Sequence, residues 1–359
     1  MNIKKVKVLI VDDSALVRDI LSKGLSADPG IEVVGTAPDV YVARDMIVKL
    51  RPDVLTLDVE MPKMDGIEFL RKLMPQYPIP VVVVSSLTQK GKDITLQALD
   101  SGAVDYVAKP MANVAEGLNA MMMELRTKVK IASTANVAHW KNKKIEEVET
   151  KITGSSALSE STDKLIAIGA STGGTEAIRK VISVLPPNTP GIVIVQHMPK
   201  GFTKTFADRM NEVSLMKVKE AEEGDRVING RILIAPGDYH MVVERSGGQY
   251  IVKLNQEEKV NGHRPSVDVL FFSVAKSVGK NAYGIILTGM GNDGAKGLKA
   301  MKDAGAKTFG QDQATSVVYG MPKVAYDLGG VDIQLPLDEI SKRLIHRIEE
   351  DRNEFERKK

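Results

Sequence analysis

Short apolar runs rich in valine and isoleucine recur along the chain, and most of them lead into a longer segment of mixed polarity. In the first third of the chain the runs are VKVLIV (6–11), VLTL (54–57), VVVV (81–84) and AVDYVAKP (103–110). The intervening segments predict helices around 15–26, near 40–50 and over 66–74. Strands that are apolar on both faces and alternate with helices predict a doubly wound α/β fold with a parallel sheet.

The second half of the chain repeats this alternation. Its strand-like runs are LIAIGAS (165–171), GIVIVQHM (191–198), GRILIAPG (230–237) and YGIILTG (283–289). They predict a second doubly wound parallel sheet, of the Rossmann-like kind. Residues 240–255 differ, because two alternating runs flank Ser-Gly-Gly there and predict a β-hairpin. Residues 338–359 predict a terminal helix with a charged end.

Between the two halves the composition changes. Residues 127–162 are rich in Lys, Glu, Ser and Thr and contain few apolar residues, which is typical of a linker. The one tryptophan, Trp140, is expected to pack against a neighbouring domain. We therefore predict a first domain over 1–126, a linker over 127–162 and a second domain over 163–359.

Bulk composition excludes several classes of protein. The chain has 359 residues, a net charge of +3 and no cysteine, so disulfides, zinc–thiolate sites and a cysteine nucleophile are absent. The charges are mixed along the chain, which argues against a nucleic-acid binder or a transcription factor. The N-terminal apolar run is too short for a signal peptide, and no run is long enough to span a membrane. We expect a cytoplasmic protein without membrane insertion.

Polar residues stand at several strand ends of the first half. Asp12 and Asp13 follow the first strand, Asp58 follows VLTL, Ser85 follows VVVV, and Lys109 stands at the end of YVAK. Parallel strands deliver these ends to one edge of the sheet, so the groups are expected to converge there rather than face solvent separately. Clustered carboxylates repel one another unless a cation lies among them, and Mg²⁺ prefers such oxygen ligands. This pattern indicates phosphoryl transfer to a carboxylate.

The segments VLIVDDS, DVLTLDVEMPKMDGIEFL, PVVVVSS and AVDYVAKP resemble the receiver domain of two-component response regulators, a flavodoxin-like fold. The resemblance implies that Asp58 accepts the phosphoryl group and that Ser85 and Lys109 contact it. Tyr106 matches the switch aromatic of that family. The implied Mg²⁺ ligands are Asp13, Asp58, the backbone carbonyl of Glu60 and, through water, Asp12.

The turn GASTGG (169–174) allows two interpretations. It joins a strand to a helix, a place where backbone N–H groups can bind a phosphate, but it lacks the residues of a P-loop and the full spacing of a dinucleotide site. It also matches Gly-x-Ser-x-Gly, in which a tight turn exposes a nucleophilic serine, here Ser171. On the turn alone, a nucleotide binder and a serine hydrolase both remain open.

A nucleophilic serine needs a base and a group that orients the base. His197 ends a strand and is expected on the same edge as Ser171, whereas His240, His263 and His346 lie in less suitable places. Asp293, in the glycine-rich loop after YGIILTG, is the best acid. The other candidates, in turns or helix caps, are Asp225, Asp238 and Asp268. The order Ser-His-Asp differs from the Ser-Asp-His order of α/β-hydrolases.

The segments IAIGASTGGTEAI, IVIVQHMPKGFT, ILIAPGDYHM, NGHRPSVDVLF and LTGMGNDGAKGL resemble the catalytic domain of the chemotaxis protein-glutamate methylesterases. The resemblance implies a triad of Ser171, His197 and Asp293, supported by Thr172 and by the Met290 N–H at the oxyanion.

The implied activity is phosphorylation-controlled hydrolysis of glutamate γ-methyl esters, with deamidation of glutamines as a second activity. The implied partners are chemoreceptors as substrate and a chemotaxis histidine kinase as phosphodonor. We expect a monomer without a cofactor in the catalytic domain. The rival hypotheses are a binding protein with a silent esterase site and a receiver-controlled nucleotide binder.

Overall fold

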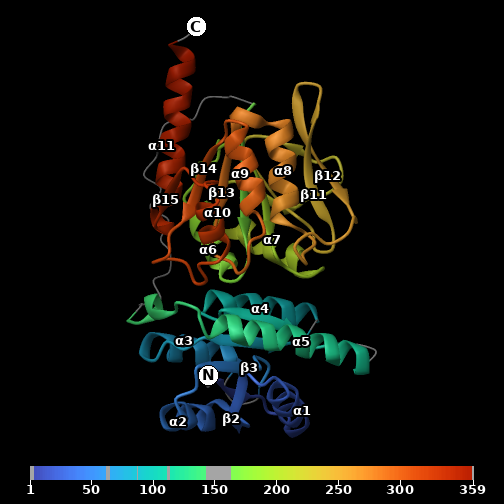
Figure 1. Ribbon diagram of the computed structural model, residues 1–359, viewed down its shortest axis with the longest axis vertical. Helices are drawn as coiled ribbons and strands as arrows, with labels where there is room; N and C mark the ends of the chain where they lie inside the picture. Colours follow the sequence, from blue (N-terminus) through green and yellow to red (C-terminus); the bar gives the residue numbers. More distant parts are fainter. Residues whose placement is uncertain (1–3, 62–64, 87, 111–113, 143–162, 358–359) are drawn as a thin grey trace. The chain divides into compact units, whose positions relative to one another are not determined.

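The computed structural model describes residues 4–61, 65–86, 88–110, 114–142 and 163–357 (Figure 1). The chain divides into two compact units, Met1–Glu146 and Glu147–Lys359.

The first unit contains a five-stranded sheet with the order β2-β1-β3-β4-β5. All of its neighbouring strands are parallel. The strands are β1 (Val6–Val11), β2 (Ile31–Ala37), β3 (Val54–Leu57), β4 (Val81–Ser85) and β5 (Asp105–Ala108). Every residue of β3 and β4 is buried, which is why these runs are apolar throughout. The predicted parallel α/β sheet is confirmed.

Helices connect consecutive strands of this sheet, and one more helix, α5, follows its last strand. They are α1 (Ala15–Ser26), α2 (Val40–Leu50), α3 (Gly66–Gln76), α4 (Gln89–Asp100) and α5 (Val114–Ala132). The first four begin behind a Ser, Asp or Thr whose side chain accepts a hydrogen bond from the first turn, so the sequence sets where each helix starts. Helix α1 packs against α5, and α3 packs against α4.

The predicted boundary after residue 126 lies inside α5. This helix continues to Ala132, and a short 3₁₀ helix, η1 (Ala138–Trp140), follows it. Trp140 is buried, and a Cβ built on Gly102 would lie 3.1 Å from its ring. The segment up to 142 therefore packs on the first unit, as expected for Trp140, although its composition is polar. Residues 143–162 of the predicted linker lie outside the described residues, and the domain limits stay a prediction.

The second unit contains a seven-stranded parallel sheet with the order β15-β14-β13-β6-β7-β10-β8. The strands are β6 (Leu165–Ala170), β7 (Gly191–Gln196), β8 (Lys217–Glu220), β10 (Arg231–Ile234), β13 (Ala282–Ile286), β14 (Lys307–Gln311) and β15 (Ile333–Leu335). The chain extends the sheet from β6 toward β7 first and adds β13 on the other side of β6 later. The ends of β6 and β13 thus form a topological switch point, where ligands bind in such sheets.

Helices cover both faces of this sheet (Figure 1). They are α6 (Gly174–Ile182), α7 (Phe202–Val213), α8 (Val267–Ser277), α9 (Ala295–Asp303), α10 (Met321–Asp327) and α11 (Leu337–Glu356), with a 3₁₀ turn η2 (Gly279–Asn281). Helix α6 packs against α7 and α11, whereas α8 packs against α9. The predicted terminal helix is α11.

The predicted hairpin is confirmed as β11 (His240–Ser246) and β12 (Gln249–Asn255), joined by Gly247 and Gly248. A short strand, β9 (Arg226–Val227), pairs with β12 to give an antiparallel three-stranded sheet. Helix α8 packs against β11, and Val243 bonds through its backbone to Ser273 and Ser277. This contact fixes α8, whose N-terminus lies at the candidate site described below.

Candidate functional site

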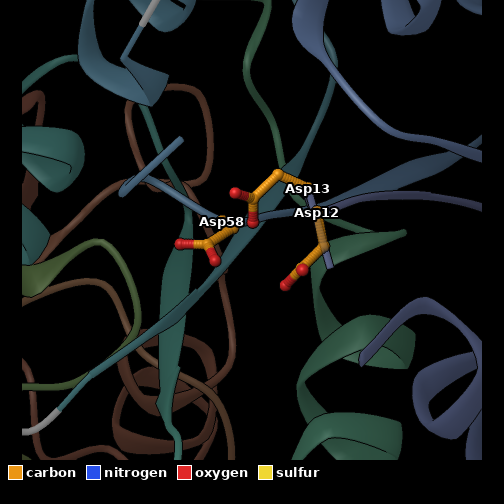
Figure 2. Close-up of side chains that lie close together, drawn as sticks. All are labelled: Asp12, Asp13 and Asp58. Carbon is orange, nitrogen blue, oxygen red and sulfur yellow. The ribbon is translucent and has the colours of Figure 1, made fainter. Parts of the chain in front are cut away.

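Three carboxylates converge at the edge of the first sheet. Asp12 and Asp13 follow β1, Asp58 follows β3, and one oxygen from each lies within 4.8 Å of the others (Figure 2). Asp12 and Asp58 are buried, whereas Asp13 is exposed. An exposed carboxylate beside two buried ones gives an all-oxygen donor set that water can reach, and this suits a hard cation such as Mg²⁺. The residues therefore fit the predicted metal.

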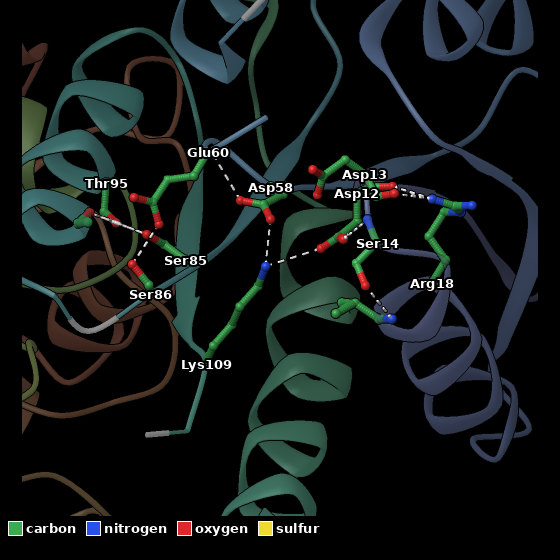
Figure 3. Close-up of polar contacts among 12 residues, drawn as sticks. Asp12, Asp13, Ser14, Arg18, Asp58, Glu60, Ser85, Ser86, Thr95 and Lys109 are labelled. Atoms are coloured by element: carbon green, nitrogen blue, oxygen red, sulfur yellow. Dashed lines mark hydrogen bonds and ion pairs between the residues drawn. The ribbon is translucent and has the colours of Figure 1, made fainter. Parts of the chain in front are cut away.

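The Lys109 ammonium joins this cluster. Its Nζ lies 2.6 Å from Asp58 Oδ2 and 3.2 Å from Asp12 Oδ2 (Figure 3). Burial alone would lower the pKa of Lys109, but the two carboxylates outweigh it and raise the pKa above its usual range. Burial raises the pKa of Asp12 despite the attraction of Lys109. Lys109 thus stays charged and partly neutralises the acidic cluster.

Ser85, which ends β4, forms its hydrogen bonds away from Asp58. Its hydroxyl is fully buried, accepts a hydrogen bond from Thr95 at 2.7 Å and donates to the Gly91 carbonyl, so it is held against α4 (Figure 3). The Glu60 N–H donates to Asp58 Oδ1, while the Glu60 side chain accepts from Ser86. Tyr106 is buried.

In the second unit, the turn after β6 carries Ser171. The Ser171 N–H donates to the Thr288 carbonyl at 3.0 Å, and its own carbonyl accepts from the Gly174 N–H at 2.7 Å. Gly173 has φ +75°, and a Cβ on Gly174 would lie 2.7 Å from that of Ala170. The small residues of GASTGG are therefore needed because the turn is tight and closely packed.

His197 follows β7 and links Ser171 to Asp293. Its Nδ1 lies 3.2 Å from Ser171 Oγ, and its Nε2 lies 2.7 Å from Asp293 Oδ2. Because an ionised carboxylate can only accept, Nε2 carries the proton, and Nδ1 is left to accept from the serine hydroxyl. Gln196 connects the turn after β6 with the loop after β7, since its Nε2 donates to the carbonyls of Ser171 and His197 at 2.9 and 3.2 Å.

Asp293 is buried in a shell of hydrogen-bond donors. Besides His197, the donors are Asn261 Nδ2, Ser266 Oγ and the backbone N–H groups of Val267 and Asp268. Ser266 is the N-cap of α8, so the positive end of that helix also faces the carboxylate. Burial alone would raise the pKa of Asp293, but these bonds outweigh it and hold the pKa well below its usual range.

The other candidate residues have different surroundings. His240 is fully buried between the Ser266 N–H and the Glu258 carbonyl, and His346 is exposed on α11 beside Glu350. His263 lies at the site, because its ring stacks on that of His197 with the centroids 3.7 Å apart.

The three other aspartates considered as the acid also have different surroundings. Asp225 caps a turn at the Glu222 N–H, and Asp238 pairs with Arg264. Asp268, in the first turn of α8, is buried beside Asp293 and accepts from the Gly297 N–H at 2.7 Å.

The loop after β13 lies directly against the serine. A Cβ built on Gly289 would lie 2.7 Å from Ser171 Cβ, so only a glycine permits this approach. Met290 follows and has 46% of its surface exposed. Thr172 is buried, and its carbonyl accepts from Thr288 Oγ1 at 3.0 Å. The predicted support residues thus flank Ser171.

Comparison with known proteins decides the family. The family model for CheB methylesterase matches residues 166–344, and that for the response regulator receiver domain matches residues 8–121. A protein-glutamate methylesterase/protein-glutamine glutaminase of Syntrophotalea carbinolica is 61% identical over 350 residues, which cover 97% of this chain and 99% of the relative. The chain belongs to the protein-glutamate methylesterase/protein-glutamine glutaminase family.

Other members of the family support this assignment. The relative of the same name from Nitrosomonas europaea is 51% identical over 96% of this chain and 97% of its own length. The crystal structure of the Thermotoga maritima CheB methylesterase catalytic domain is 41% identical, with a TM-score of 0.51. It covers 52% of this chain and 99% of its own. The predicted receiver and methylesterase folds are confirmed.

Sequence reasoning missed several residues of this methylesterase-type site. Gln196, Asn261 and Ser266 contact the predicted residues but were given no role, although Gln196 ends β7 and the other two lie in the segment NGHRPSVDVLF. Gln196 directly precedes His197, and this position was the available signal for Gln196.

Within the described residues, no helix is both long and apolar enough to cross a membrane.

Proposed function

We propose that this chain hydrolyses glutamate γ-methyl esters of chemoreceptors, with Ser171 as the nucleophile. The observation that carries the proposal is a continuous line of hydrogen bonds from Ser171 through His197 to Asp293, in a chain of this family. The relay pairs a serine with a base, and the base with a buried anion that fixes its tautomer.

The reaction follows from this geometry. His197 Nδ1 removes the Ser171 proton as Oγ attacks the ester carbonyl carbon, and His197 returns that proton to the departing methoxy group to release methanol. A water then attacks the acyl-enzyme in the same way and releases the free glutamate. The Met290 N–H, supported by Thr172, stabilises the oxyanion. Asp293 stays ionised and stabilises the imidazolium.

The same acyl-enzyme gives the second activity. If the substrate is a glutamine side chain, His197 protonates the leaving amine and ammonia departs in place of methanol. The two activities of the family's name therefore need one set of residues.

The enzyme acts in the cytoplasm as a monomer and needs no cofactor in its second unit. It does not bind nucleic acid or insert into the membrane.

The first unit is the switch for this activity. Asp58 accepts a phosphoryl group from a chemotaxis histidine kinase, and Lys109 balances the arriving charge. Asp13, Asp58, the Glu60 carbonyl and, through water, Asp12 would hold Mg²⁺, which would neutralise charge on the transferred group. Ser85 then leaves Thr95 and contacts the phosphoryl oxygens, and Tyr106 responds as the switch aromatic.

The experiment is a methanol-release assay on methylated receptor membranes. Ser171→Ala is expected to lower the rate by about 10³-fold or more, because removal of the nucleophile leaves only the residual catalysis of the site. Ser246→Ala, on the exposed end of β11, is the matched control and is expected to keep full activity. A Ser171→Ala variant that releases methanol as fast as the parent would leave a binding protein with a silent site as the better account.

A further inference from the structure

The side-chain amide of Asn261 lies between two buried carboxylates. Its Nδ2 is 2.7 Å from Asp293 Oδ1 and 2.8 Å from Asp268 Oδ2. Asp293 and Asp268 are only 2% and 3% exposed, so water does not separate their charges. One NH₂ group therefore donates its two hydrogens to two different anions.

This arrangement answers an electrostatic problem. Two carboxylates that approach each other in a buried site repel strongly, and one of them would otherwise take up a proton. The neutral Asn261 amide places positive hydrogens between them without adding a charge. Gly297 N–H donates to the far oxygen of Asp268, so both oxygens of Asp268 are satisfied as well.

The backbone at Asn261 is shaped for this role. Asn261 has φ +53°, a conformation that asparagine tolerates better than most residues, and Val260 and His263 pair across the turn. The same turn presents His263, whose ring stacks on His197. A single turn thus touches both the base and the acid of the relay.

We infer that Asn261 is a positioning residue, which fixes the Asp293 carboxylate against His197 Nε2 by shielding it from Asp268. This inference rests on the proposed function, since it assigns Asn261 a part in the same hydrolysis. It acts through Asp293 and does not touch the substrate.

The test compares full-length variants in the methanol-release assay at varied receptor-membrane concentration. Asn261→Gly removes the amide and keeps the positive φ. It is expected to lower kcat by about 10- to 100-fold, the range for a lost hydrogen bond to a charged group, with KM changed by less than about twofold. Asn142→Gly is the matched control, because Asn142 also has a positive φ, +60°, but is exposed in the first unit.

A second substitution separates positioning from a structural role. In Asn261→Gly, adding Asp268→Asn removes the opposing charge. Its Oδ1 still accepts from the Gly297 N–H, and its Nδ2 points into the space that Asn261 left. Activity is expected to recover by about fivefold or more. In the parent background, Asp268→Asn places its NH₂ group against that of Asn261 and is expected to lower activity. The same substitution is thus expected to raise activity in Asn261→Gly and to lower it in the parent.

The inference is overturned if Asn261→Gly keeps the kcat of Asn142→Gly, or if Asp268→Asn lowers activity equally in both backgrounds. Urea unfolding of each variant, followed by circular dichroism, identifies a loss that comes only from misfolding, which also counts against it. Ser171→Ala separates the two proposals. If that variant is active, the proposed function fails, and if it is inactive while Asn261→Gly matches its control, only the inference about Asn261 fails.

Discussion

At the scale of single residues, Asp293 is buried and yet charged because donors surround its carboxylate. Since its pKa lies below the usual range in the folded protein, the unfolded chain binds this proton more tightly. The charge therefore stabilises the fold above the ordinary carboxyl pKa of about 3.9, and the contribution is lost as the pH falls below that value.

Asp293→Asn is expected to lower the free energy of unfolding of the second unit by about 2 kcal/mol or more at neutral pH. The difference in the free energy of unfolding between the variant and the parent is expected to narrow below about pH 4. Urea unfolding followed by circular dichroism measures this free energy. The fluorescence of Trp140, the one tryptophan, reports on the first unit and serves as the internal control. A difference that stays constant down to low pH would show that the charge is not what stabilises the fold.

The residue scale also shows where sequence reasoning succeeds. Ser171, His197 and Asp293 each follow a strand of one parallel sheet, so topology alone predicts that they meet. Asn261 and Ser266 could not be found in this way. They reach Asp293 from the turn after β12 and from the cap of α8, and their contact depends on tertiary packing that has no period in the sequence.

At the scale of elements, the loop after β13 and the turn after β6 lie in close contact at Gly289 and Ser171. Gly289→Ala would place a Cβ 2.7 Å from Ser171 Cβ and push the serine away from His197. We expect kcat to fall by about tenfold or more, because small displacements of reacting groups are costly. Gly248→Ala, in the hairpin turn with no neighbour within 4 Å, is the control for the same change and is expected to keep its activity.

Methanol release measures both variants. If Gly289→Ala equals Gly248→Ala in rate, the close approach of the two loops has no part in placing the serine.

The predicted strands of the parallel sheets are largely buried, and the hairpin, whose tip is exposed, was predicted from its alternating pattern and its turn. Strands β1, β3 and β6 are continuous apolar runs and were found, as was the hairpin with its Gly-Gly turn. Strands β2, β8 and β14 were missed. Their sequences contain Glu, Lys, Thr or Gly and so do not form apolar runs. Strands β2 and β8 lie at the edges of their sheets and expose part of one face. In β14, the glycine Gly310 packs against Val331. Edge position is a tertiary property that a local pattern does not carry.

At the scale of the whole molecule, each unit places its polar groups at the switch point of a parallel sheet. In the first unit, Asp12 and Asp58 directly follow β1 and β3, where the strand order reverses. In the second unit, Ser171 directly follows β6, which lies beside β13. The same architecture thus holds a cluster of carboxylates in one unit and the hydrogen-bonded Ser171, His197 and Asp293 in the other, and the two sites differ because the residues at their strand ends differ.

The most direct test of the whole account is methanol release from methylated receptor membranes with and without a small phosphoryl donor and Mg²⁺. The parent is expected to release methanol faster when the donor and Mg²⁺ are present. Asp58→Asn should keep its basal rate and show no increase, because it lacks the acceptor carboxylate, and Ser171→Ala should release none above background under either condition. Release by Ser171→Ala at the parent rate, or full activation of Asp58→Asn, would contradict the account.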